Sequence, residues 1–211
     1  MTSTLLALLL SAAAGGAPAS GQVRGTPHDL TRGAATSAAP GGASGGPCAY
    51  CHASHDAGPG LSSRPEPGGQ HVPYASATMA SRPGAPTGAT RACLSCHDGT
   101  IAPGQTRASL RQGGAAAAAG APIAAARPSN LGTDLRRGHP VSFAPAPGGD
   151  VQPPPPGDAV RLDPSGQVQC TSCHDPHRQF GGDPAGRFLV KSTRRSALCL
   201  TCHSASAVAA A

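Results

Sequence analysis

Four copies of the pentapeptide Cys-x-x-Cys-His constrain this chain most, because they use all eight of its cysteines. This spacing is the attachment signature of c-type haem. Each cysteine sulfur bonds one vinyl group of the haem, and the histidine is held under the ring, where its imidazole can bind the iron. We therefore predict four covalently bound haems, attached to Cys48, Cys51, Cys93, Cys96, Cys170, Cys173, Cys199 and Cys202, with His52, His97, His174 and His203 as proximal iron ligands.

Zinc sites and disulfides are the other common uses of so many cysteines. Two Cys-x-x-Cys pairs can together bind one zinc ion. Neither zinc nor a disulfide requires a histidine directly after the second cysteine of every pair, and histidine makes only 9 of the 211 residues. Haem attachment accounts for all four of these histidines, so we favour it over both alternatives.

Residues 1–19 are predicted to form a secretory signal peptide. Leu5–Leu10 is an apolar run, and small residues follow it up to a cleavage site of the A-x-A form at Ala17-Pro18-Ala19. The run is shorter than the roughly 20 residues that span a bilayer, and no later segment is apolar enough. We expect export across the inner membrane, to the periplasm or outside the cell, and no transmembrane segment in the mature chain.

The composition leaves little apolar surface for an ordinary core. Leu, Ile, Val and Phe together make 28 of the 211 residues, Gly and Pro make 52, and Trp is absent. Such a chain cannot bury enough apolar side-chain surface to offset its conformational entropy. Four porphyrins would supply that surface, so we expect a thin wrapping of chain around the haems and no fold without them.

The formal net charge is +6, and Lys191 is the only lysine beside fifteen arginines. A basic chain suggests an acidic partner or nucleic acid. Each ferric bis-histidine haem with two propionates adds about −1, which brings the oxidised holoprotein to about +2. We therefore predict no nucleic-acid binding and expect some arginines to pair with haem propionates.

The motifs form two pairs, within residues 48–97 and 170–203. An Ala/Gly-rich stretch at 112–127 and a Pro-rich stretch at 144–157 lie between the pairs and are typical of surface loops. No long helical or alternating strand pattern occurs. We expect one haem-cored domain over residues 20–211, made mostly of irregular chain with short α-helices and little β structure.

Five histidines remain outside the motifs, and four irons need ligands on their far faces. His55 and His177 each follow a proximal histidine by three residues, which is too close to reach the far face of the same haem but allows binding to a neighbouring one. Pro140 stiffens the chain after His139, and Asp29 beside His28 is placed to orient its imidazole. We predict as distal ligands His28, His55, His139 and His177. His71 is the predicted spare, with Met79 as a weaker competitor.

The pairing of these ligands with individual haems is a further hypothesis. His55 is expected to bind the haem on Cys93 and Cys96, and His177 the haem on Cys199 and Cys202. The remaining two haems would then be bound by His28, for the first motif, and by His139, for the third.

These stretches resemble a known family, the small multihaem c-type cytochromes of the doubled-CxxCH type that bacteria secrete. The resemblance covers most of residues 25–205 outside the low-complexity loops, and in this family histidines at such positions are distal ligands. It implies a small haem-cored tetrahaem cytochrome. Ser54 departs from the pattern, because proline often precedes that histidine. The matching stretches are Cys48–His55, Gly88–Thr100, Gly138–Phe143, Cys170–His177 and Leu198–His203.

Bis-histidine ligation leaves no iron position open to a substrate, so we expect an electron carrier, not an enzyme. It would exchange electrons with redox partner proteins. A second hypothesis is a self-assembling subunit of an extracellular cytochrome filament, in which His28 could reach a neighbouring subunit. A third is a multihaem reductase, which would need a five-coordinate iron with an acid or base poised over it.

Overall fold

The computed structural model describes residues 23–31, 46–52, 64–107, 120–146, 151–178 and 187–205. The predicted signal peptide and His55 lie outside these residues, as do parts of both predicted loops. The described parts of those loops contain no helix.

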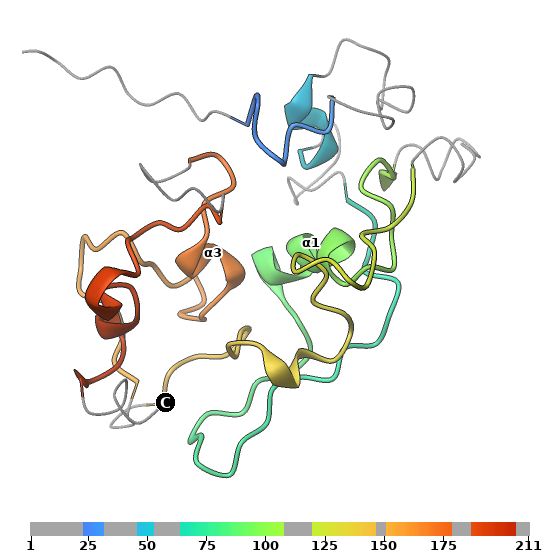
Figure 1. Ribbon diagram of the computed structural model, residues 1–211. Coiled ribbons are helices and arrows are strands. Elements are labelled where there is room, and N and C mark those ends of the chain that lie inside the picture. Colours follow the sequence, from blue (N-terminus) through green and yellow to red (C-terminus); the bar gives the residue numbers. More distant parts are fainter. Residues whose placement is uncertain are drawn as a thin grey trace, which may run out of the picture.

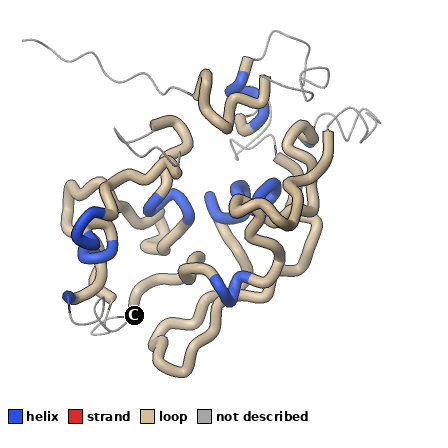
Figure 2. The backbone as a smooth tube through the Cα atoms, viewed as in Figure 1, coloured by secondary structure: helices blue, strands red, loops and turns tan. Residues whose placement is uncertain are grey.

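Short helices are the regular elements of the described chain, and irregular backbone connects them (Figure 2). Backbone pairing in the described residues is confined to isolated bridges, such as Phe143 with Val168. These observations confirm the prediction of mostly irregular chain with short helices and little β structure. The elements are α1 (Gly88–His97), α3 (Cys170–Cys173), and the 3-10 turns η3 (Pro47–Tyr50), η5 (Leu135–Arg137), η6 (Arg194–Ser196) and η7 (Cys199–Thr201).

Each CxxCH motif lies in one of these helical turns. η3 and η7 begin the first and fourth motifs, α3 contains the third, and α1 ends with the second. The amide of the motif histidine donates to the carbonyl of the first cysteine in three motifs, at 2.9 Å for His52, 3.0 Å for His174 and 2.9 Å for His203. This closed turn places both cysteines and the histidine on one side of the helix, as haem attachment requires.

Gly99 ends α1 directly after the second motif. Its φ of +73° lies in the left-handed region, which glycine adopts without strain. A Cβ at this position would also overlap the side chain of Asn130. The glycine therefore lets the chain turn away at once and lets the segment around Asn130 lie against the end of α1.

The apolar core is small. α1 and α3 lie side by side at its centre (Figure 1). Burial of one large apolar side chain contributes about 1.5–3 kcal/mol, whereas fixing one residue of backbone costs about 1–2 kcal/mol. A core of this size cannot hold the described chain in place alone, which agrees with a fold built around haem. The buried apolar residues of the described chain are Tyr50, Leu94, Ile101, Ala102, Phe143, Val160, Val168 and Phe188.

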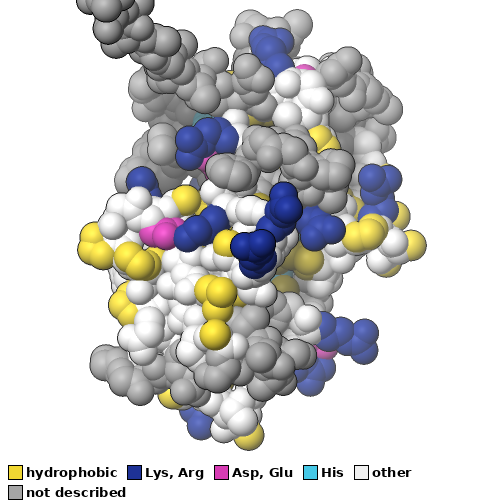
Figure 3. Space-filling model, turned by 60° about the vertical axis from the view of Figure 1, so that its left-hand side comes forward, with side chains coloured by type: hydrophobic (Ala, Val, Ile, Leu, Met, Phe, Trp, Pro, Cys, Tyr) yellow, Lys and Arg dark blue, Asp and Glu magenta, His cyan; other side chains and the backbone are white. Residues whose placement is uncertain are grey.

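The surface carries more Lys and Arg than Asp and Glu on the face shown in Figure 3. This matches the formal positive charge of the chain. Among the described residues, no helix has the length and apolar character needed to cross a membrane.

Candidate haem sites

At three of the four motifs, a segment from elsewhere in the chain donates a backbone hydrogen bond to the motif; we call these the crossing segments. Leu131 donates to the carbonyl of His97 at 2.6 Å, Val190 to that of Cys173 at 2.9 Å, and Gln152 to that of Cys202 at 2.8 Å. Sequence reasoning missed these crossing segments, and assigned one of them, at 151–152, to a surface loop. No residue type in them carries a haem signature, so only the folded chain shows their role.

The crossing segments also fix two proximal imidazoles. Nδ1 of His97 lies 2.7 Å from the carbonyl oxygen of Ser129, and Nδ1 of His174 lies 2.6 Å from that of Arg187. A carbonyl only accepts hydrogen bonds, so Nδ1 carries the proton and donates. The proton-free Nε2 is then the atom available to a metal, the usual arrangement of a metal-binding histidine.

Three predicted distal histidines lie opposite three proximal histidines. The ring centroids are 5.9 Å apart for His52 and His177, 6.0 Å for His97 and His28, and 6.2 Å for His203 and His139. An iron between two imidazoles has bonds of about 2 Å to each nitrogen, and each nitrogen is about 1 Å from its ring centre, which gives about 6 Å between centroids. The described histidine pairs therefore have the spacing that a bis-histidine haem iron needs.

These pairs differ from the pairing predicted from the sequence. His177 lies by His52 of the first motif and not by His203 of the fourth. His28 lies by His97, and His139 lies by His203. The prediction assumed that the three-residue spacing between a proximal histidine and the next histidine links the two haems of one motif pair. The fold instead brings His177, which follows the third motif, to His52 of the first motif, so this spacing links one motif pair to the other.

His28 reaches its position through packing. Its ring lies 4.7 Å from that of Phe188, centroid to centroid, and Phe188 is buried. Burial lowers the pKa of His28, and repulsion from His97 lowers it further, so the neutral, metal-binding form is favoured. Nδ1 of His28 is buried without a hydrogen-bond partner among the described residues. The expectation that Asp29 orients this ring is therefore wrong; Asp29 instead accepts from the amide of Gly25 at 2.9 Å.

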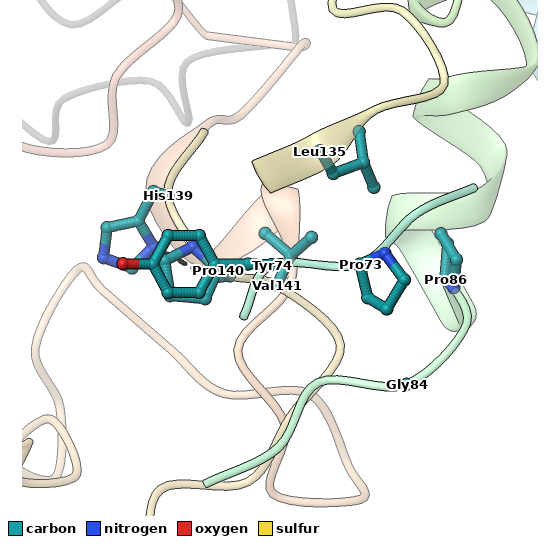
Figure 4. A pocket seen from close by; sticks show the side chains of 8 residues that line it. All are labelled: Pro73, Tyr74, Gly84, Pro86, Leu135, His139, Pro140 and Val141. Carbon is teal, nitrogen blue, oxygen red and sulfur yellow. Dashed lines mark hydrogen bonds between the residues drawn. The ribbon is translucent and has the colours of Figure 1, made fainter. Parts of the chain in front are cut away.

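The other two predicted distal histidines in these pairs have hydrogen-bond partners at Nδ1. Asp175 accepts from Nδ1 of His177 at 3.1 Å and from its amide at 2.9 Å. Nδ1 of His139 lies 2.9 Å from the carbonyl oxygen of Pro140. Figure 4 shows Tyr74 and Pro140 beside His139, in the lining of a cavity of about 10 Å³. The proline and tyrosine thereby limit the positions open to this imidazole.

His71 lies apart from these imidazole pairs. Its Nε2 is 3.2 Å from Oδ2 of Asp98, without the alignment of a hydrogen bond, and both side chains are buried. The other carboxylate oxygen, Oδ1, accepts from the amide and the hydroxyl of Thr100, at 2.8 and 2.7 Å. The choice of His71 as the spare histidine stays a prediction.

The cysteines of successive motifs are neighbours. Burial raises the pKa of Cys96, and Cys51 of the first motif raises it further. Cys93 and Cys170 perturb each other, since the pKa of Cys93 is raised and that of Cys170 is lowered to about 7. Burial and then the charge of Cys202 raise the pKa of Cys173 to about 11. Cysteines of successive motifs therefore lie close enough to influence one another's pKa.

A family model, the doubled CXXCH motif, matches residues 163–208, which contain the third and fourth motifs. No curated protein matches the sequence of the chain. The family match and the motif geometry identify this segment as a c-type cytochrome-like region that binds haem c covalently.

Proposed function

We propose that the chain is a tetrahaem c-type cytochrome whose four haems each have two histidine ligands, and that it transfers electrons in the periplasm or outside the cell. When bound, each haem would supply a one-electron oxidation and reduction at its iron. The three imidazole pairs with centroids near 6 Å carry this proposal. Both faces of an iron between such a pair are occupied, which favours electron transfer over binding of a substrate.

His55 is proposed as the distal ligand for the fourth pair, opposite His174. His177 follows His174 by three residues and lies opposite His52. His55 follows His52 by the same three residues, so a reciprocal arrangement of the two CxxCHxxH segments places His55 toward His174. His55 itself lies outside the described residues.

A single chain provides both histidines of each described pair, including His28, which the filament hypothesis would give to a neighbouring subunit. We therefore propose a carrier that works with separate redox partner proteins. Enzymatic turnover is not part of the proposal. Nitrite or hydroxylamine reduction by the purified protein well above the rate of free haem peptides would overturn this part.

Two measurements test the haem content and the ligation. The intact mass should exceed that of the mature polypeptide by four haem units after acid extraction. The reduced protein should show a low-spin spectrum that carbon monoxide leaves unchanged, because every iron already has two strong ligands. A mass with fewer haems, or a response to carbon monoxide in the native protein, would contradict the proposal.

A combination of variants tests the pairing. His177→Ala should convert one haem to high spin and open it to carbon monoxide. The same substitution combined with Cys48→Ser and Cys51→Ser should lose this signal, because the affected haem is no longer attached. A signal that survives this combination but disappears with Cys199→Ser and Cys202→Ser would instead support the pairing expected from the sequence.

A further inference from the structure

α1 and α3 form the junction between the two motif pairs, because α1 ends in the second motif and α3 contains the third. The helices lie side by side at the centre of the molecule (Figure 1). The contacts between the two helices therefore determine the separation of the attachment sites at Cys93 and Cys170.

Two hydrogen bonds connect α1 to the start of α3. The hydroxyl of Thr90 accepts from the amide of Cys170 at 3.1 Å, and the amide of Thr90 donates to Oε1 of Gln169 at 3.2 Å. Thr90 has no exposed surface, and Gln169 is 1% exposed. Water does not compete for these bonds, so each one restrains the two backbones directly.

Cys93 and Cys170, the first cysteines of their motifs, lie near each other one turn further along α1. Cys93 follows Thr90 by three residues and therefore faces the same side of the helix. The hydrogen bond from the amide of Cys170 to Thr90 therefore brings Cys93 and Cys170 to the same side of the junction. The neighbouring thiol lowers the pKa of Cys170 to about 7 and raises that of Cys93. In the proposed holoprotein each of these sulfurs would be the thioether link to its own haem, so the junction would bring two attachment sites close together.

We propose that Thr90 and Gln169 are positioning residues that hold the attachment sites of the second and third motifs next to each other, and that a one-electron transfer between bound haems would cross from one motif pair to the other at this junction. The inference rests on the proposed function. The transfer moves one electron from the reduced site to the oxidised site and forms or breaks no bond. The protein contributes a fixed short separation, as it does for other redox cofactors.

The test uses the holoprotein with Thr90→Val, which keeps the shape of the side chain but removes the acceptor for Cys170. Losing one hydrogen bond favours an open junction by about fivefold. Electron paramagnetic resonance of the oxidised protein should show a weaker magnetic interaction between low-spin haems. Flash reduction should show slower equilibration of the electron among the haems. Thr90→Ser, which keeps the hydroxyl, should behave as the native protein does.

Thr106→Val is the matched control, because Thr106 is as fully buried as Thr90 and lies outside every CxxCH motif and both helices. An equal loss of haem interaction in this control would overturn the proposal, and so would an unchanged interaction in a Thr90→Val protein that has lost only thermal stability. If the valine variant does not fold, Gln169→Met tests the same junction from α3. Haem content and low-spin ligation are measured first, so a failure of the proposed function is distinguished from a failure of this junction.

Discussion

Asp175 makes two contacts with His177, one of the proposed distal ligands. Its Oδ1 accepts from both the amide and the Nδ1 of His177. Although burial raises the pKa of Asp175, hydrogen bonds from His177 and Arg178 outweigh it and leave the pKa below its usual value. A carboxylate partner makes the imidazole a stronger electron donor to a metal than a neutral partner does.

Asp175→Asn should therefore raise the midpoint potential of one haem. Hydrogen bonds to a charged group exceed those to a neutral one by about 1 kcal/mol, which is roughly 40 mV for one electron. A spectroelectrochemical titration of the holoprotein measures the shift. Asp134→Asn, which removes an exposed partner of Arg136, is the control and should leave all potentials unchanged. Equal titration curves for the Asp175 variant and the native protein would contradict the assignment.

His71→Ala should lower stability without changing the haem spectrum. The substitution removes a buried side chain, together with the 3.2 Å contact of its Nε2 with Oδ2 of Asp98, at a cost of about 2 kcal/mol. Chemical denaturation measures this loss, and the absorption spectrum with carbon monoxide checks the ligation. High-spin haem in the His71 variant, with none in the His177 variant, would show that His71 is an iron ligand and that His177 is not.

At the scale of elements, the sequence predicts the parts whose chemistry is local. Both cysteines and the proximal histidine lie within one helical turn. The five consecutive residues of the motif therefore predict an attachment site without any knowledge of the rest of the fold. Distal ligation depends on which distant segments meet. His177 and His139 could be chosen as ligands by count and position, but their partners, His52 and His203, could not. The crossing segments escaped prediction because their backbone amides and carbonyls, not their side chains, contact the motifs.

Lys191 connects the irregular segment around Asp158 to the 3-10 turn η7. Its Nζ donates to Asp158 at 2.7 Å and to Thr201 in η7 at 3.0 Å. The hydrogen bond from Lys191 is the largest cause of the lowered pKa of Asp158. A lowered carboxyl pKa stabilises the fold above the unfolded value of about 3.9, and this stabilisation is lost as the pH falls through the folded value.

Lys191→Met should accordingly cost about 0.5 kcal/mol at pH 7, as expected for a partly exposed ion pair. The difference from the native protein should shrink as the pH falls below about 4, because protonated Asp158 no longer attracts the lysine. Guanidinium titrations of the holoprotein at several pH values measure it. Arg136→Met, which removes a more exposed pair, serves as the comparison. A difference that is constant across this pH range would show that Lys191 contributes through packing alone.

At the scale of the molecule, the fold joins the two motif pairs more closely than their separation in the sequence suggests. His177 of the third motif segment lies opposite His52 of the first, and the amide of Cys170 donates to the hydroxyl of Thr90 in α1, which ends in the second motif. The first and second motif pairs are therefore in contact with each other. The organisation of residues 20–211 as one haem-cored domain stays a prediction.

Removal of all four attachment sites should leave a chain without fixed structure. The few buried apolar side chains of the described residues cannot offset the conformational entropy lost when the described chain is ordered. A variant with all eight cysteines replaced by serine should show a disordered far-ultraviolet circular dichroism spectrum and rapid proteolysis at every loop. The native holoprotein should resist the same protease, because its histidine–iron bonds and porphyrin faces replace the missing core. Cooperative thermal unfolding of the cysteine-free variant would show that the polypeptide alone holds the fold.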